Sequence, residues 1–145
     1  MIRAAIILVL ALSAGASAQT DGSDWADDVV AQVRPAPVYP FVGAQYGMTA
    51  ICLASHNVSA DGRAVDICVA CTVGEFYNPP QSAVRRATRK FAEATEEALQ
   101  QWRYDEANWG DRGVETEFRF SMQRGIPGGL PDPPAMNQCA GSETP

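Results

Sequence analysis

The dipeptide Asp61-Gly62, which stands between two stretches of alternating residues, constrains the fold of this chain more than any other feature. Asp-Gly in that setting is a strong signal for a tight turn between two antiparallel strands. We therefore predict strands over Met48–Val58 and Val65–Cys71, which form a hairpin. The faces of the first strand are Thr49, Ile51 and Leu53 against Ala50, Cys52 and Ala54; those of the second are Ile67, Val69 and Cys71 against Asp66, Cys68 and Ala70.

A helix and a third strand follow the hairpin. Asn78-Pro79-Pro80-Gln81 is expected to open the helix with Asn78 as its N-cap, and a break or bend is expected near residues 88–90 because of the charge order. Val114–Phe120 alternates between apolar and charged residues, which is typical of a half-buried strand. These elements predict an α+β fold in which one long helix packs on a three-stranded antiparallel sheet. The predicted core stripe of the helix is Val84, Ala87, Phe91, Ala94, Ala98, Leu99 and Trp102.

The N-terminus has the features of an export signal. Arg3 precedes an apolar run from Ala4 to Leu12, and Ala16-Ser17-Ala18 is a small-residue cleavage site before Gln19. This order predicts a signal peptide over residues 1–18 and a periplasmic, secreted product. The alternative is an uncleaved inner-membrane anchor, although the apolar run is shorter than the roughly 20 residues that a span requires.

The rest of the chain divides into three parts. Residues 19–34 are predicted to form a short N-terminal helical segment, because Trp25, Val29 and Val33 recur at a spacing of four. Residues 35–121 hold the folded domain, in which Phe41–Tyr46 is expected to form one or two helical turns that end at Gly47. Residues 122–145 are rich in Pro, Gly and small polar residues, and an irregular tail is expected there.

The cysteine count and the charge limit the class of protein. The chain has four Cys and a net charge of −6. An exported chain with an even number of Cys favours disulfides over metal ligands or catalytic thiols, and an acidic chain is not expected to bind nucleic acid. Four Cys allow three pairings. Cross-strand geometry favours Cys52–Cys68, which leaves Cys71 to pair with Cys139.

No group of residues in the sequence predicts catalysis. His56 is the single imidazole, it lacks an evident nucleophile or orienting partner, and we expect it to be exposed on the hairpin. Asp24, Asp27 and Asp28 are expected to form a solvated face rather than a metal site. We therefore predict a protein that is not an enzyme and that uses no cofactor or metal. An exposed helix face is expected for Arg85, Arg86, Arg89 and Lys90.

Residues 35–121 resemble the C-terminal domain of TonB, the energy transducer of Gram-negative envelopes. Pro37-Val38-Tyr39-Pro40 is similar to the P-x-Y-P motif of that family, and Asp61-Gly62-Arg63 is similar to its first hairpin. The segment from Phe91 to Tyr104 resembles the family helix, which ends in A-hydrophobic-x-x-W-[RK]-[FY]. Val114–Phe120 stands in the place of the third strand. The residues that carry the resemblance are Tyr39, Pro40, Gly47, Gly62, Phe91, Trp102 and Tyr104.

The resemblance implies a peptide-binding role for the third strand. In the TonB family this strand takes up the N-terminal box of outer-membrane receptors by strand addition, which needs only backbone hydrogen bonds. It implies an envelope protein as the partner here, a TonB-dependent receptor among the candidates; strand-exchanged homodimers stay open. The alternative is an anchored energy transducer for TonB-dependent transport. The implied partner-binding residues are Val114, Glu115, Thr116, Glu117, Phe118, Arg119 and Phe120.

Overall fold

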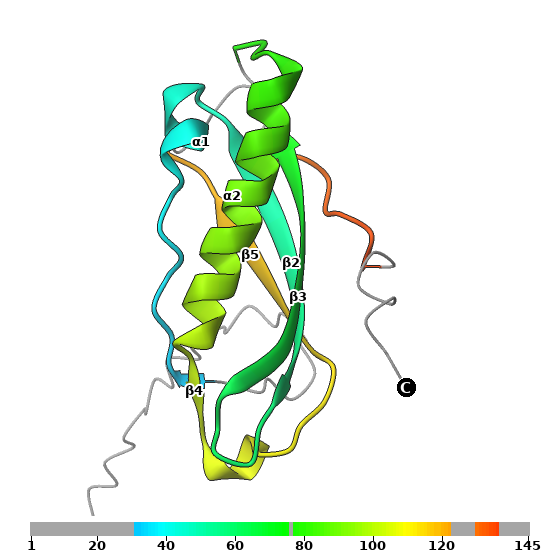
Figure 1. Cartoon of the computed structure of the whole chain (residues 1–145). Helices are drawn as coiled ribbons and strands as arrows, with labels where there is room; N and C mark the ends of the chain where they lie inside the picture. Colours follow the sequence, from blue (N-terminus) through cyan, green and yellow to red (C-terminus); the bar gives the residue numbers. More distant parts are fainter. Residues whose placement is uncertain (1–30, 76, 123–129, 137–145) are drawn as a thin grey trace, which may run out of the picture.

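The computed structural model describes residues 31–75, 77–122 and 130–136 (Figure 1). The predicted signal peptide, most of the predicted N-terminal helix, and Cys139 lie outside the described residues. The elements, in chain order, are β1 (Ala31–Val33), α1 (Phe41–Gln45), β2 (Thr49–Val58), β3 (Ala64–Gly74), α2 (Gln81–Gln100), β4 (Arg103–Tyr104), the 3-10 turn η1 (Glu106–Asn108) and β5 (Val114–Phe120).

The main sheet is antiparallel and has the strand order β3-β2-β5. Helix α2 lies across one of its faces (Figure 1). The face of β2 beneath the helix carries only small residues in its centre, namely Ala50, Cys52 and Ala54, all of them fully buried. Small side chains let a helix approach the sheet closely, which explains why this face is turned toward α2. The α+β architecture that the periodicities predict is therefore confirmed.

A second sheet, which the sequence does not predict, pairs β1 with β4. Ala31 lies opposite Tyr104, and Val33 lies opposite Arg103. The expected helix over residues 19–34 is therefore wrong at its C-terminal end, where the described residues form a strand. The reason is tertiary: a spacing of four is a local preference, and pairing with a strand about 70 residues away overrides it.

Helix α2 is continuous from Gln81 to Gln100, so the expected break near residues 88–90 is wrong. A single buried stripe that includes Ala87, Phe91 and Leu99 runs along the helix and holds it against the sheet. The start of the helix also differs from the prediction. Its N-cap is Pro80 and no side chain caps it, because Asn78 lies outside the helix with a positive φ of 47°.

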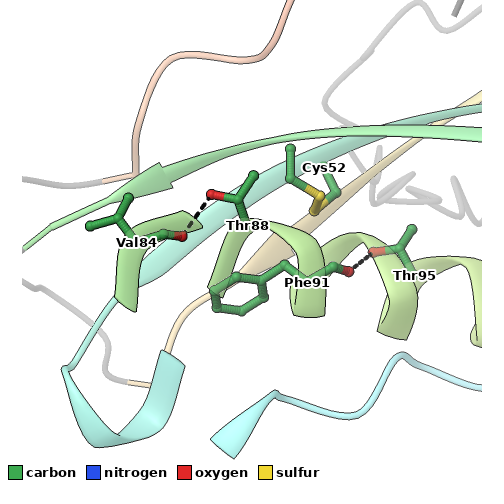
Figure 2. Close-up of a disulfide and its surroundings, with 6 residues drawn as sticks. Cys52, Val84, Thr88, Phe91 and Thr95 are labelled. Atoms are coloured by element: carbon green, nitrogen blue, oxygen red, sulfur yellow. Dashed lines mark hydrogen bonds between the residues drawn. A yellow bond between two sulfur atoms is a disulfide. The ribbon is translucent and has the colours of Figure 1, made fainter. Parts of the chain in front are cut away.

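Cys52 is bonded to Cys71, not to Cys68 as predicted (Figure 2). The prediction assumed the wrong pair of strand faces on the same side of the hairpin. The pairing register places Cys52 directly opposite Cys71 and Ser55 opposite Cys68, so the small-residue face of β2 meets the more apolar face of β3. The expected Cys71–Cys139 bond is therefore wrong as well. Cys68 is also disulfide-bonded.

An aromatic cluster joins helix α2 to β5 and to the segment before α1. The ring of Phe91 lies 4.8 Å from that of Phe120 and 5.4 Å from that of Tyr39. Gly43 of α1 fits against the same ring, because a Cβ added there would lie 2.5 Å from Cζ of Phe91. Trp102, directly after α2, packs on Phe118 with the ring centres 5.5 Å apart. This cluster fixes the position of β5 relative to the helix.

Candidate peptide-binding edge

Strand β5 is an edge strand. It pairs with β2 along its whole length, from Val114 opposite His56 to Phe120 opposite Ala50. No other strand among the described residues pairs with it. Between residues 31 and 122, no backbone hydrogen bond from a turn, loop or cap reaches β5 either. The outer edge of this strand therefore presents N–H and C=O groups that can pair with an added strand.

The tail of the chain does not cover this edge in the part that the structure describes. Residues 130–136 lie on the side of β3, away from β5 (Figure 1). The contact that places them there is between Pro131 and the end of β3, since a Cβ added to Gly74 would lie 3.3 Å from Cδ of Pro131. The two edges of the sheet thus have different surroundings.

The side chains of β5 alternate between the core and solvent, as the sequence predicts. Phe118 and Phe120 are buried beneath α2, whereas Glu115, Glu117 and Arg119 are exposed on the opposite face. Glu117 and Arg119 form an ion pair with each other. Glu115 takes part in none of the ion pairs formed between described residues.

Residues 34–39, which we call the strap, run along the side of the domain from the β1–β4 pair to α1 (Figure 1). Trp102 holds the strap at one end, since its Nε1 donates a hydrogen bond to the Pro35 carbonyl at 3.2 Å. The Arg34 guanidinium lies 4.8 Å from the centre of the same indole ring. At the other end Tyr39 packs on Phe120 and donates its hydroxyl proton to the Met48 carbonyl.

A groove of about 400 Å³ lies between the strap and β5. Its floor is aromatic, and its two long walls are the strap and the outer edge of the strand. The strap forms no ladder with β5, and Pro35 and Pro37 disfavour one because they have no backbone N–H to donate. The groove is lined by residues 34–37, Tyr39, Trp102 and residues 116–121.

The β2–β3 hairpin and the loop before β5 are joined by the side chain of Asn57. Its Nδ2 donates to Asp66 of β3 at 3.0 Å, and its Oδ1 accepts from the backbone N–H of Gly113 at 3.0 Å. Gly113 has a positive φ of 64° and directly precedes β5. Asn57 therefore sets the point at which β5 begins, next to Glu115.

His56 is buried, so the expectation that it is exposed on the hairpin is wrong. Only 1% of its surface is accessible, and its Nε2 lies 2.5 Å from the hydroxyl oxygen of Tyr104. Its Nδ1 has no hydrogen-bond partner among the described residues. Burial lowers the pKa of the imidazole to about 4 and raises the pKa of the Tyr104 hydroxyl to about 12. The pair joins β2 to β4 in the core.

The other residues that the sequence analysis considers as possible site residues do not line the groove. The basic residues of α2 are exposed, and two of them, Arg89 and Lys90, form ion pairs with Glu93. Residues 24–28 lie outside the described part of the chain. Where the chain is described, no three His, Cys, Asp or Glu side chains are grouped closely enough to hold a metal ion. The groove beside β5 is therefore the feature that we carry forward.

The sequence predicts β5 but not the groove. The groove depends on the contact between residues 34–39 and residues 116–121, which lie far apart in the chain. A signal was nevertheless present: Pro35, Pro37 and Pro40 recur before α1, and such a segment favours an extended conformation while it lacks the donors of a strand.

Comparison with known proteins adds one finding. No family model and no curated protein matches the sequence. Among solved structures, that of the TonB2 protein from Vibrio anguillarum matches at 24% identity, over 74% of this chain and 95% of that chain, with a TM-score of 0.40.

In residues 31–75, 77–122 and 130–136, no helix has the length and apolar character that a membrane span requires. Residues 1–18, which the sequence predicts to be either a cleaved signal peptide or an uncleaved anchor, lie outside this range.

Proposed function

We propose that this protein is a periplasmic binding module that takes up an extended peptide of an envelope protein as an added strand on β5. The observation that carries the proposal is the outer edge of β5, which no other described strand pairs with and which lies beside a groove whose far wall, the strap, contains Pro35 and Pro37. A long edge strand is normally blunted or covered. Here the covering segment lies next to the edge, but two of its residues, Pro35 and Pro37, have no backbone N–H with which to pair.

Binding in this mode needs no catalytic group, and we propose that the protein is not an enzyme. The affinity comes from backbone hydrogen bonds, so the partner is selected by its extended conformation and by the side chains on its two faces. The family resemblance makes an outer-membrane TonB-dependent receptor the first candidate. Self-association of two β5 strands is a competing use of the same edge, and a sedimentation measurement on the free protein separates the two.

Amide hydrogen exchange tests the proposal at the level of single residues. The probe is a synthetic peptide of alternating valine and threonine, equal in length to the seven residues of β5. We expect the peptide to slow exchange at every second amide of Val114–Phe120, because alternate residues of an edge strand direct their N–H groups away from β2. The second edge strand, β3, is the internal control. Protection of β3 with β5 unchanged, or no protection at all, contradicts the proposal.

The native partner and the anchored alternative need separate experiments. A pull-down of envelope proteins that recovers outer-membrane receptors, and that the probe peptide competes away, supports the receptor as partner. N-terminal sequencing of the protein from cell envelopes then distinguishes the module from an energy transducer. A mature start at Gln19 excludes the anchored form, whereas an intact Met1 supports it.

A further inference from the structure

The groove beside β5 selects the side chains of a bound peptide, in addition to the extended backbone that strand addition requires. An added strand lies about 4.8 Å from β5 and turns alternate side chains to opposite faces. On one face these side chains point into the groove, toward Pro35, Ala36 and Pro37 of the strap. On the other face they stand next to Glu115. The two faces of the peptide therefore meet surfaces of different chemistry.

On the side of the strap, the groove is lined by the apolar side chains of Pro35, Ala36 and Pro37, and two buried rings lie behind it. Trp102 is 4% exposed and Phe118 is 9% exposed, and both rings are packed before any peptide arrives. The indole N–H of Trp102 already donates to the Pro35 carbonyl, so it does not donate to a peptide. Two cations border the groove: Arg34 lies over the face of the same indole, and Arg119 is paired with Glu117. A charged or polar side chain placed against Pro35, Ala36 and Pro37 would lose water without gaining a side-chain partner from them, whereas an apolar one gains from burial.

The opposite face carries unbalanced negative charge. Arg119 is paired with Glu117, which leaves Glu115 without a cation among the described ion pairs. Side chains directly opposite each other on neighbouring antiparallel strands come within about 5 Å at Cβ, and opposite charges there stabilise the pairing while like charges destabilise it. The chain as a whole has a net charge of −6, which acts in the same direction.

We infer that the peptide taken up by β5 presents aliphatic side chains at alternate positions toward the strap and a lysine or arginine beside Glu115. This inference rests on the proposed function, because it assumes strand addition at β5. It goes beyond it by naming the chemistry that selects the partner. A peptide with an acidic residue beside Glu115, or with polar residues on the groove face, binds more weakly.

Three synthetic peptides test the inference on the full chain purified from the cell envelope. The first alternates valine with threonine and carries one lysine among the threonines. The second has glutamate in place of that lysine, and the third has serine in place of the valines. Isothermal titration calorimetry measures the affinity of each peptide. Replacing the lysine by glutamate is expected to weaken binding by up to about fivefold, and replacing the valines by serine is expected to weaken it at least tenfold, since several buried apolar side chains are lost.

Two variants with matched controls locate both effects. Glu115→Lys is expected to reverse the preference, so that the glutamate peptide binds more tightly than the lysine peptide, while Glu96→Lys on the exposed side of α2 leaves the order unchanged. Ala36→Asp places a carboxylate in the groove from the exposed strap and is expected to weaken the valine peptides at least tenfold. Ala60→Asp, in the exposed turn between β2 and β3, is its control.

The outcomes separate the inference from the proposed function. Equal affinity of the three peptides, with protection of the β5 amides by each, overturns the inference and leaves strand addition standing. A lysine preference that survives in Glu115→Lys overturns the assignment of the charged face. Protection of β3 alone, or binding without any protected amide in β5, overturns both proposals.

Discussion

Acidification is predicted to destabilise this protein through His56. The imidazole is 1% exposed, and burial lowers its pKa from 6.5 to about 4. The unfolded chain therefore takes up the proton first as the pH falls, so stability is lost between about pH 6.5 and pH 4 and is fully present above that window. A change in pKa of this size corresponds to roughly 3 kcal/mol, at 1.36 kcal/mol for each unit.

The contacts around the ring support this direction. A protonated imidazole donates from both nitrogens, and among the described residues only Nε2 has a partner, the Tyr104 hydroxyl. The charged form would thus leave an N–H on Nδ1 buried and unpaired. His56 also lies opposite Val114 at the start of β5, so loss of this contact is expected to loosen the end of the binding edge.

Urea unfolding at pH 7 and at pH 4.5 measures the effect in the wild-type protein and in His56→Gln. Glutamine does not titrate in this range and keeps a polar atom near the Tyr104 hydroxyl, and the contributions of Asp and Glu are common to both proteins. Between the two pH values the wild type is expected to lose about 2 kcal/mol more than the variant. An equal loss in both proteins, or an NMR titration that places the pKa of His56 near 6.5, refutes the reasoning.

Two further predictions concern packing and the disulfide. Non-reducing peptide mapping is expected to recover a fragment in which Cys52 is linked to Cys71, whereas a fragment that links Cys52 to Cys68 contradicts the structure. Substituting both cysteines by Ala is expected to lower the free energy of unfolding by about 3 kcal/mol, because the bond closes a loop across 19 positions. Gly43→Ala is expected to lower stability by about 1 to 3 kcal/mol, because the new Cβ would lie 2.5 Å from the Phe91 ring. Calorimetric melting that leaves Tm unchanged in this variant would show that α1 is not packed as described.

The parts of the fold that the sequence predicts are those with a local periodicity. Val114–Phe120 is the range of β5 in the structure, because its alternation of charged and apolar residues repeats every two positions. Helix α2 is found for the same reason, from a stripe that repeats every three or four residues. The motifs that resemble the TonB C-terminal domain add the expectation that hairpin, helix and third strand follow one another as in that family, which no single periodic pattern predicts.

The parts that the sequence does not predict depend on distant partners. His56 is buried by a contact with Tyr104, 48 residues away, and nothing in the neighbouring residues indicates it. The sequence predicts the wrong partner for Cys52, because the pairing depends on which face of β2 is turned toward α2. Cys52 lies on that face. The groove requires the strap and β5 to lie side by side, which depends on the contacts of Trp102 and Tyr39.

The central claim, that β5 accepts a peptide as an added strand, is tested most directly by NMR contacts between backbone protons of the two chains. With a labelled protein and an unlabelled lysine-bearing valine–threonine peptide, we predict contacts between the peptide backbone and alternate residues of Val114–Phe120, and none with β3. Contacts confined to β3 or to the exposed face of α2, or a peptide that binds without an extended backbone, would contradict the account.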